Sequence, residues 1–427
     1  MSDVERPTPY NFPAKHSHPF AILSNQEYSM IKTNSVRAWV LAARPKTLTG
    51  AVAPVLVGAA FAYARLWHDL TQQQPDSQTS ILHFFKSTLP TFFTSSTGFT
   101  DLKMLPLLKS LSATFHDTLP GLTHSPFSAT HHILSSLFHT ALPGLFNSSV
   151  LQLFNPTILP FLLCLLFAIL MQIDANLIND YFDFRKGSDR EDRLGPERAC
   201  AQGWVTPRAM CIAIGITTFL SCLVGLGILF IHLQWELLGV GALCVLFSFL
   251  YTTKLSYLGW GDLLVLVFFG LIPVIFTYYV LTGGGWNIPL VIASVAMGLA
   301  TDNLLIVNNY RDRYQDEKSG KRTIIVRLLQ SRIRRYGTEK GRLEGEQDAL
   351  DIYLWLGIFA TLLAFTALFL YPYSTIRYPL MLIYLILHFR TFRQLKTLDG
   401  KALNQVLGAT ARNIFLFGLL LGVSVFL

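Results

Sequence analysis

Long apolar stretches dominate this sequence and limit the folds open to it. Of its 427 residues 52% are hydrophobic and 14% are charged, whereas soluble domains carry about 25% charged residues. Nine of these stretches are close to the roughly 20 residues that a helix needs to cross a bilayer. They are 38–66, 157–181, 209–232, 236–256, 262–282, 287–309, 350–371, 376–395 and 408–427. We therefore expect an all-α integral membrane protein with nine transmembrane helices.

The distribution of positive charge predicts which helix ends share one side of the membrane. The positive-inside rule places Lys- and Arg-rich connections in the cytoplasm. Most of the 34 Lys and Arg residues fall in four segments, namely 1–46, 182–208, 310–349 and 389–401. We expect a cytoplasmic segment over 1–37 and a multi-pass domain over 38–427 in the inner, cytoplasmic membrane of the cell. The net charge of +8 thus reflects topology, and no motif favours nucleic-acid binding.

Two segments between the apolar stretches look like insertions. Residues 68–155 are rich in Ser, Thr, Phe, His and Pro and contain no stretch long enough to span a bilayer. We expect them to form an outer, periplasmic surface loop. Residues 310–349 are expected to form a cytoplasmic loop, and their second part, 327–349, carries mixed charge, which predicts a solvated inner loop or a short helix.

The first cluster of polar residues lies at the end of the second apolar stretch. Asn176, Asn179, Asp180 and Asp183 follow the i, i+3, i+4, i+7 spacing of one helix face, and Asp189 comes shortly after. A lone helix-end Asp would simply reach water, whereas four polar residues on one stripe favour a site. Oxygen ligands suit Mg²⁺. We expect Asn176, Asn179, Asp183 and Asp189 to bind metal, and Asp180 and Asp183 to act in catalysis.

A second acidic cluster lies at the end of the sixth apolar stretch. Asp312 and Asp316 are four residues apart, so they share a helix face, and we expect both to bind metal and to act in catalysis. Arg clamps phosphate in a bidentate manner and Lys provides a point charge. The basic residues that we expect at a diphosphate are Arg44, Lys46, Lys254, Arg311, Lys321 and Arg327. The positive-inside rule explains several of these charges nearly as well.

The two clusters together suggest one shared function. Both fall on the predicted inner side, and each has Arg and Lys beside it. That combination favours a site that holds divalent cations against a diphosphate. A transporter or channel is the alternative, because intramembrane Asp and Asn also build ion pathways. Transporter sites lie near the bilayer midplane, whereas these acids lie at helix ends, which favours the diphosphate site.

Four motifs resemble those of the UbiA superfamily of intramembrane aromatic prenyltransferases. The family pattern Asn-Asp-Tyr-x-Asp-x-x-x-Gly-x-Asp matches residues 179–189, and its Arg-x-Gly-Pro-x-Arg run matches 193–198. Its second acidic motif matches residues 308–323, and its Arg-Pro-Lys-Thr-Leu run matches 44–48. Within the superfamily the motifs are most similar to those of the 1,4-dihydroxy-2-naphthoate polyprenyltransferases, the MenA family of menaquinone biosynthesis. Asp174 and Asp302 are carboxylates that this pattern lacks.

The resemblance implies a UbiA-type bundle of nine helices around a central cavity, embedded in membrane lipid, with an active site that faces the cytoplasm. It also implies an Mg²⁺-dependent enzyme that transfers a polyprenyl group from a polyprenyl diphosphate to 1,4-dihydroxy-2-naphthoate. The ring carboxylate would leave as CO₂ to give demethylmenaquinone. The alternative acceptors are 4-hydroxybenzoate, homogentisate and a lipid alcohol.

Overall fold

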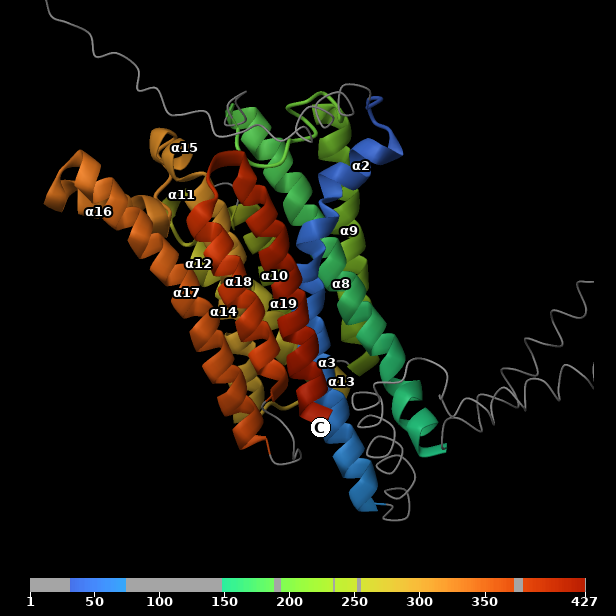
Figure 1. The fold of residues 1–427 in the computed structure, drawn as a ribbon. Helices are drawn as coiled ribbons and strands as arrows, with labels where there is room; N and C mark the ends of the chain where they lie inside the picture. The colour runs from blue at the N-terminus through green and yellow to red at the C-terminus, as the bar shows by residue number, and fades with distance from the viewer. Residues whose placement is uncertain are drawn as a thin grey trace, which may run out of the picture.

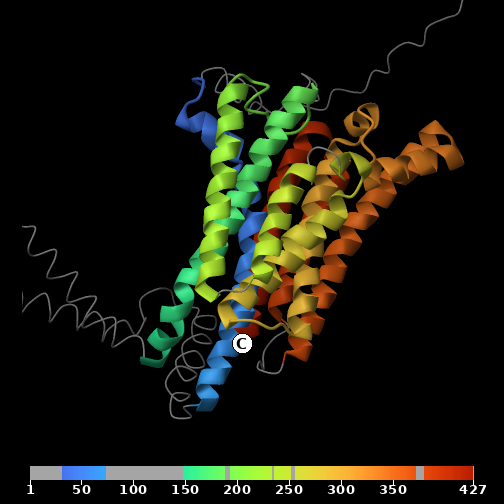
Figure 2. The ribbon, with the colours of Figure 1, turned by 180° about the vertical axis from the view of Figure 1, so that it is seen from behind.

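The computed structural model describes residues 31–73, 148–187, 193–232, 235–251, 255–371 and 379–426. These residues form helices and turns without any β-strand, and the long helices run side by side as one bundle (Figures 1 and 2). The predicted all-α membrane fold is therefore confirmed. Most of the predicted insertion over 68–155 lies outside the described residues, as do Asp189 and Lys254.

In the described part of the chain, 7 helices are long and apolar enough to cross a membrane. This makes the protein a multi-pass membrane protein. The seven are α3 (Pro45–Gln73), α8 (Ser148–Lys186), α9 (Pro207–His232), the continuous run of α12 (Gly261–Leu266), η6 (Val267–Leu271) and α13 (Ile272–Thr282), α14 (Ile288–Arg311), α17 (Thr338–Leu370), and the run of η7 (Gly400–Ala402) and α19 (Leu403–Phe426).

The other two predicted spans are weaker, so the count of nine is not confirmed. Helix α10 (Glu236–Leu250) has 15 residues and would extend about 22 Å, short of the roughly 30 Å hydrocarbon core. Helix α18 (Pro379–Thr397) has 19 residues but carries Arg390, Arg393 and Lys396 in its second half.

The structure corrects the start of the first span. The chain forms a separate helix α2 (Val36–Ala43) and then breaks at Arg44, whose φ of 52° is left-handed. Pro45 follows directly, and a proline disfavours helical geometry in the residue before it. The Ser35 hydroxyl caps α2 by accepting a hydrogen bond from the Ala38 amide at 3.3 Å. The break places Arg44 at the end of the bundle instead of inside a continuous helix.

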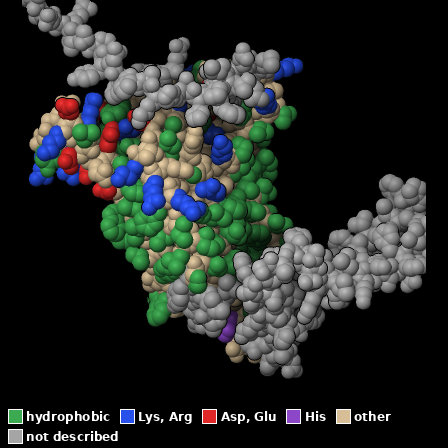
Figure 3. Space-filling view, viewed as in Figure 1, with side chains coloured by type: hydrophobic (Ala, Val, Ile, Leu, Met, Phe, Trp, Pro, Cys, Tyr) green, Lys and Arg blue, Asp and Glu red, His purple; other side chains and the backbone are tan. Residues whose placement is uncertain are grey.

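Small residues bring the central helices close together. Helix α3 packs against α8, α13 and α19, and α14 packs against α17 and α19. Ala53 of α3 faces Gly418 of α19, and Ala60, two turns further along α3, faces Gly422, one turn further along α19. Such pairs allow close backbone approach, which is a main source of helix association in membranes. Hydrophobic side chains cover the middle of the outer face, and Lys and Arg gather towards one end (Figure 3).

The segment 310–349 is mostly helical, so of the two predicted alternatives, a loop or a short helix, the structure shows helices. It contains α15 (Arg313–Lys318), α16 (Ile324–Tyr336) and the first turns of α17. Helix α16 buries Ile325, Val326 and Leu329 and packs against α17. These buried residues lie on one face of the helix, whose exposed side carries Arg327, Gln330, Arg334 and Arg335, and burying the apolar face stabilises the helix. Helices α2, α15 and α16 all lie at the same end of the bundle (Figure 1).

Candidate functional site

Both acidic clusters line a single cavity of about 630 Å³ at this end of the bundle. Asn179 and Asp183 reach it from the end of α8, while Asp312 and Asp316 reach it from the end of α14 and from α15. The structure therefore brings the two predicted clusters together. They come from helices that are more than a hundred residues apart in the chain, which makes the cavity a product of the tertiary fold.

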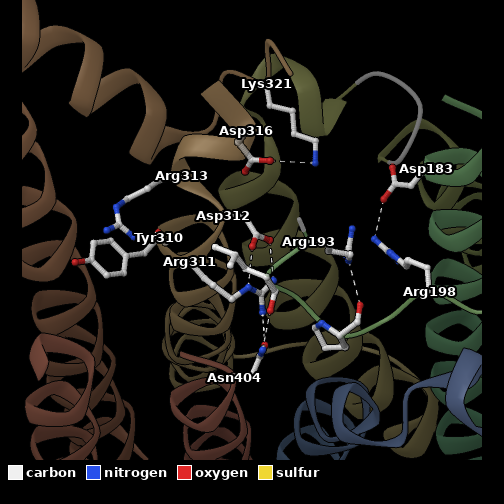
Figure 4. A network of polar contacts seen from close by, with 12 residues as sticks. Asp183, Arg193, Arg198, Tyr310, Arg311, Asp312, Arg313, Asp316, Lys321 and Asn404 are labelled. Atoms are coloured by element: carbon white, nitrogen blue, oxygen red, sulfur yellow. Dashed lines mark hydrogen bonds and ion pairs between the residues drawn. The ribbon is translucent and has the colours of Figure 1, made fainter. Parts of the chain in front are cut away.

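Asp183 is held by a buried ion pair. Its Oδ2 lies 2.7 Å from Nη2 of Arg198, and the two side chains are only 8% and 5% exposed. Arg198 lies between α8 and α9, and Arg193, Pro196 and Arg198 all line the cavity (Figure 4). A charged pair this well buried is kept only with good geometry, so Asp183 has a defined orientation towards the cavity.

Asp180 and Asn176 face away from the first cavity. The two carboxylate oxygens of Asp180 accept main-chain hydrogen bonds from Ala199 and Cys200, at 2.9 and 3.0 Å. The amide nitrogen of Asn176 donates to the Ala43 carbonyl and the Thr47 hydroxyl, both at 2.9 Å. This geometry does not support the predicted roles of Asp180 in catalysis and of Asn176 as a metal ligand. We expect both residues to position the chain around the site.

We predict that Asp180→Ala destabilises the protein by about 3 kcal/mol, because two buried amides lose a charged acceptor. Asp180→Asn keeps one acceptor and should lose about half as much. Chemical unfolding in detergent micelles measures both values. An Asp180→Ala variant that is as stable as the parent protein but inactive would show instead that Asp180 acts directly on substrate.

The second cluster is anchored by Arg311. Its Nε and Nη2 donate to the two oxygens of Asp312 at 2.8 and 2.7 Å. Its Nη1 donates to Asn404 of α19 at 2.8 Å, and Asn404 in turn donates to the Leu194 carbonyl at 2.8 Å. Gly195 packs on the guanidinium, where a Cβ would lie 2.7 Å from Nη2. Arg311 therefore ties α14, α19 and the 193–198 segment together beside Asp312.

Lys321 lies between the two clusters. Its Nζ is 3.3 Å from Oδ1 of Asp316 and reaches towards Asp183 on the opposite side (Figure 4). Burial raises the pKa of Asp316, and Lys321 partly offsets this. Burial alone would lower the pKa of Lys321, but Asp316 and Asp183 outweigh it and raise the pKa overall. Lys321 is thus held as a cation that faces both groups of carboxylates.

The remaining predicted basic residues differ in where they lie relative to the cavity. Arg44 lines the cavity, whereas Lys46 is exposed and is not among its lining residues. Arg327 does not line it either, because its Nη2 donates to the Leu258 carbonyl at 2.5 Å and holds a neighbouring loop. Lys254 lies outside the described residues.

Several residues that were not predicted as site residues also line the cavity, among them Lys186, Arg193, Arg198 and Tyr257. For Arg193 and Arg198 the family-like run over 193–198 was the available signal. The sequence did not indicate a binding role for Lys186, because the positive-inside rule already explains a lysine at an inner helix end.

The donor set fits magnesium. Asp183, Asp312 and Asp316, with Asn179 and Asn309, offer only oxygen and amide groups to the cavity. Within the described ranges no three His, Cys, Asp or Glu side chains form a complete metal site. Mg²⁺ is usually bound by one or two carboxylates, with waters and substrate phosphates completing its shell. These residues would hold Mg²⁺ only together with a phosphate ligand.

A second cavity of about 350 Å³ extends from the first into the bundle. The residues that line both cavities, at their junction, are Arg44, Thr47, Asn179, Tyr251, Leu305 and Asn308. The second cavity is lined mainly by apolar side chains, among them Phe167, Met171, Phe268, Phe269 and Phe276. A charged mouth therefore leads to an apolar interior, which suits a molecule with an anionic head and a hydrocarbon tail.

The two unusual carboxylates lie outside this arrangement. Asp174 is fully buried and accepts a hydrogen bond from Thr218 of α9 at 2.9 Å. Asp302 is 6% exposed, and its Oδ1 makes no hydrogen bond with any residue that the structure describes. Neither residue is among those that line the two cavities.

The fold and the site define a class of protein, namely a multi-pass membrane protein with a cavity lined by acidic and basic residues at one end of its helix bundle. A sequence profile described as the UbiA prenyltransferase family matches residues 138–420. The chain belongs to the UbiA prenyltransferase family.

Several curated proteins are similar in sequence. The 1,4-dihydroxy-2-naphthoate octaprenyltransferase of Escherichia coli (strain K12) is 39% identical over 184 residues, covering 41% of this chain and 59% of that protein. The protein of the same name from Mycobacterium tuberculosis is 36% identical, with 40% and 59% covered. UbiA prenyltransferase domain-containing protein 1 of Danio rerio is 34% identical, with 39% and 50% covered. The chain thus matches less than two thirds of the length of each.

One solved structure is also similar. Its title reads "Structural and mechanistic insights into the biosynthesis of Digeranylgeranylglyceryl phosphate synthase in membranes", and it matches with a TM-score of 0.42 at 21% sequence identity. The match covers 63% of this chain and 86% of that one.

Proposed function

We propose that this protein is a polyprenyltransferase that moves a polyprenyl group from its diphosphate to 1,4-dihydroxy-2-naphthoate, releasing CO₂ and diphosphate and giving the hydroquinone form of demethylmenaquinone. The observation that carries the proposal is the charged cavity that continues into an apolar one, with both acidic clusters at its mouth. The similar proteins of E. coli and M. tuberculosis are both named 1,4-dihydroxy-2-naphthoate octaprenyltransferase, which supports this acceptor.

The basic residues of the first cavity bind the diphosphate. Arg44, Arg193 and Lys321 line it, and their positive charge offsets the charge that grows on the diphosphate as the carbon–oxygen bond breaks. Because they stand in place before the reaction, they stabilise the leaving group without reorganisation. Magnesium held by Asp183, Asp312 and Asp316 would supply Lewis-acid stabilisation of the same oxygens.

The apolar cavity protects the reacting carbon. Breaking the allylic bond leaves a cation, which water would quench. The aromatic and aliphatic lining of the second cavity excludes water, so the electron-rich acceptor ring is the nucleophile that reaches the cation. In a hydroxynaphthoate the carbon that is attacked carries the carboxylate, and loss of CO₂ restores the aromatic ring.

The membrane orientation forms part of the same proposal. The cavity end is also the end at which Lys and Arg gather, which supports a cytoplasmic orientation of this end under the positive-inside rule. The polyprenyl diphosphate would enter from the lipid of the inner leaflet, with its head group at the cavity mouth.

We predict that membranes containing this protein release labelled CO₂ from carboxyl-labelled 1,4-dihydroxy-2-naphthoate when a polyprenyl diphosphate and Mg²⁺ are present. EDTA should abolish the release and excess Mg²⁺ should restore it, because the carboxylates of the cavity need a metal to hold the diphosphate. Scintillation counting of trapped CO₂ measures the reaction. Transfer to 4-hydroxybenzoate or homogentisate, with none to the naphthoate, would contradict the proposed acceptor while keeping the reaction class.

A further inference from the structure

Tyr257 places its ring against two lysines of the first cavity. The Nζ of Lys186 is 4.1 Å from the ring centroid, and the Nζ of Lys321 is 5.4 Å from it. Both distances fall within the range of a cation–π interaction. Lys186 is the last residue of α8, and Lys321 lies in the loop between α15 and α16. One ring therefore joins cations from the two acidic motifs, and all three residues line the cavity.

The backbone around Tyr257 is fixed to the loop that carries Lys321. The Tyr257 carbonyl accepts a hydrogen bond from the Arg322 amide at 3.0 Å. Arg327 donates to the carbonyl of the next residue, Leu258, at 2.5 Å. Gly259, with a φ of 79°, packs directly on the Arg322 carbonyl, where a Cβ would overlap the oxygen. The ring thus has a defined position relative to Lys321.

An aromatic ring holds cations in a way that a carboxylate does not. Its negative face attracts an ammonium group but carries no net charge. A carboxylate in the same place would neutralise Lys186, whereas the ring leaves the positive charge of Lys186 available to an anion. Lys321 also pairs with Asp316 at 3.3 Å, so for this lysine the ring acts beside a carboxylate. Two lysines that would otherwise repel each other are thereby kept near one point of the cavity, which is the arrangement that a multiply charged anion requires.

We propose that Tyr257 is a positioning residue that holds Lys186 and Lys321 as a pair of cations for the diphosphate, and that Lys186 is a further diphosphate-binding residue. This inference rests on the proposed function, because it names how the same cavity recognises its anion.

Binding of inorganic pyrophosphate in the presence of Mg²⁺ tests the proposal without any acceptor. Isothermal calorimetry is carried out on the full-length protein in detergent micelles. We expect Tyr257→Leu to weaken pyrophosphate binding about tenfold, which corresponds to about 1.4 kcal/mol. Tyr257→Phe keeps the ring face and should stay within about twofold of the parent protein. The KM for the prenyl diphosphate should follow the same order, with the KM for the acceptor unchanged.

A matched control variant and a series of isosteric rings at position 257 distinguish a loss of binding from a loss of folding. Tyr336 also lies against cations, with Arg335 at 5.4 Å and Lys340 at 5.3 Å from its ring, but it does not line the cavity. Tyr336→Leu should therefore leave pyrophosphate binding unchanged. Fluorinated phenylalanines at position 257 keep the shape of the ring and weaken its negative face, so affinity should fall as fluorine is added, even if Tyr257→Leu fails to fold.

The outcomes separate the two proposals. If the parent protein binds no pyrophosphate, the diphosphate site is wrong, and the proposed function falls with it. If the parent protein binds pyrophosphate but affinity is the same in Tyr257→Leu and across the fluorinated series, only the role of Tyr257 is overturned. A Lys186→Met variant with unchanged affinity would likewise remove Lys186 from the diphosphate site.

Discussion

Asp316→Asn is expected to lower the rate of prenyl transfer by about a hundredfold to a thousandfold, the usual effect of removing one preorganised electrostatic group. Asp316 is 7% exposed and lines the cavity beside Lys321. Asparagine has almost the same shape but no charge, so it cannot hold a divalent cation or fix the Lys321 ammonium group by ion pairing. Transfer is measured in membranes with labelled prenyl diphosphate at saturating acceptor.

A different ion pair, between Asp348 and Arg332, lies away from the cavity and provides a control. Asp348 accepts two hydrogen bonds from Arg332, at 2.6 and 2.8 Å, and neither residue lines the cavity. Asp348→Asn should retain full activity. An Asp316→Asn variant with more than a tenth of the parent rate, at equal expression, would exclude a direct role for this carboxylate.

Asp183→Asn is expected to remove activity to a similar extent and also to destabilise the fold. The variant leaves Arg198 buried without its charged partner, and breaking a buried pair in this way costs about 3–5 kcal/mol. The substitution also removes one of the anionic side chains that line the cavity. Chemical unfolding and the transfer assay report the two effects separately.

The double variant Asp183→Asn with Arg198→Gln separates stability from catalysis. It removes both charges, so most of the lost stability should return. Activity should not return, because the cavity then lacks both a carboxylate and a cation. Recovery of activity together with stability would mean that the Asp183–Arg198 pair serves only to hold the chain in place.

Helix spacing located the acidic clusters, but it did not distinguish the residues within them. At about 100° per residue, Asn179 and Asp183 lie on one edge of the predicted stripe, and Asn176 and Asp180 lie on the other. The first pair lines the charged cavity, while Asp180 meets the amides of residues 199 and 200. The choice between these edges depends on how the 193–200 segment folds back, which a local helical pattern does not contain.

For the fold as well, features set by the local sequence could be predicted, whereas features set by tertiary contacts could not. Long apolar stretches were sufficient to predict an all-α membrane bundle, and the proline after Arg44 was a visible signal for the break between α2 and α3. The roles of Lys46 and Arg327 were not accessible in this way. Both are basic residues near motifs, yet one is exposed and the other holds the Leu258 carbonyl.

The decisive experiment is a crystal structure with Mg²⁺ and a non-cleavable prenyl thiodiphosphate, because it shows whether both acidic clusters bind one diphosphate. We expect the diphosphate between Asp183 on one side and Asp312 and Asp316 on the other, with Lys321 in contact and the prenyl chain in the apolar cavity. A diphosphate bound to one cluster alone, or outside this cavity, would contradict this expectation.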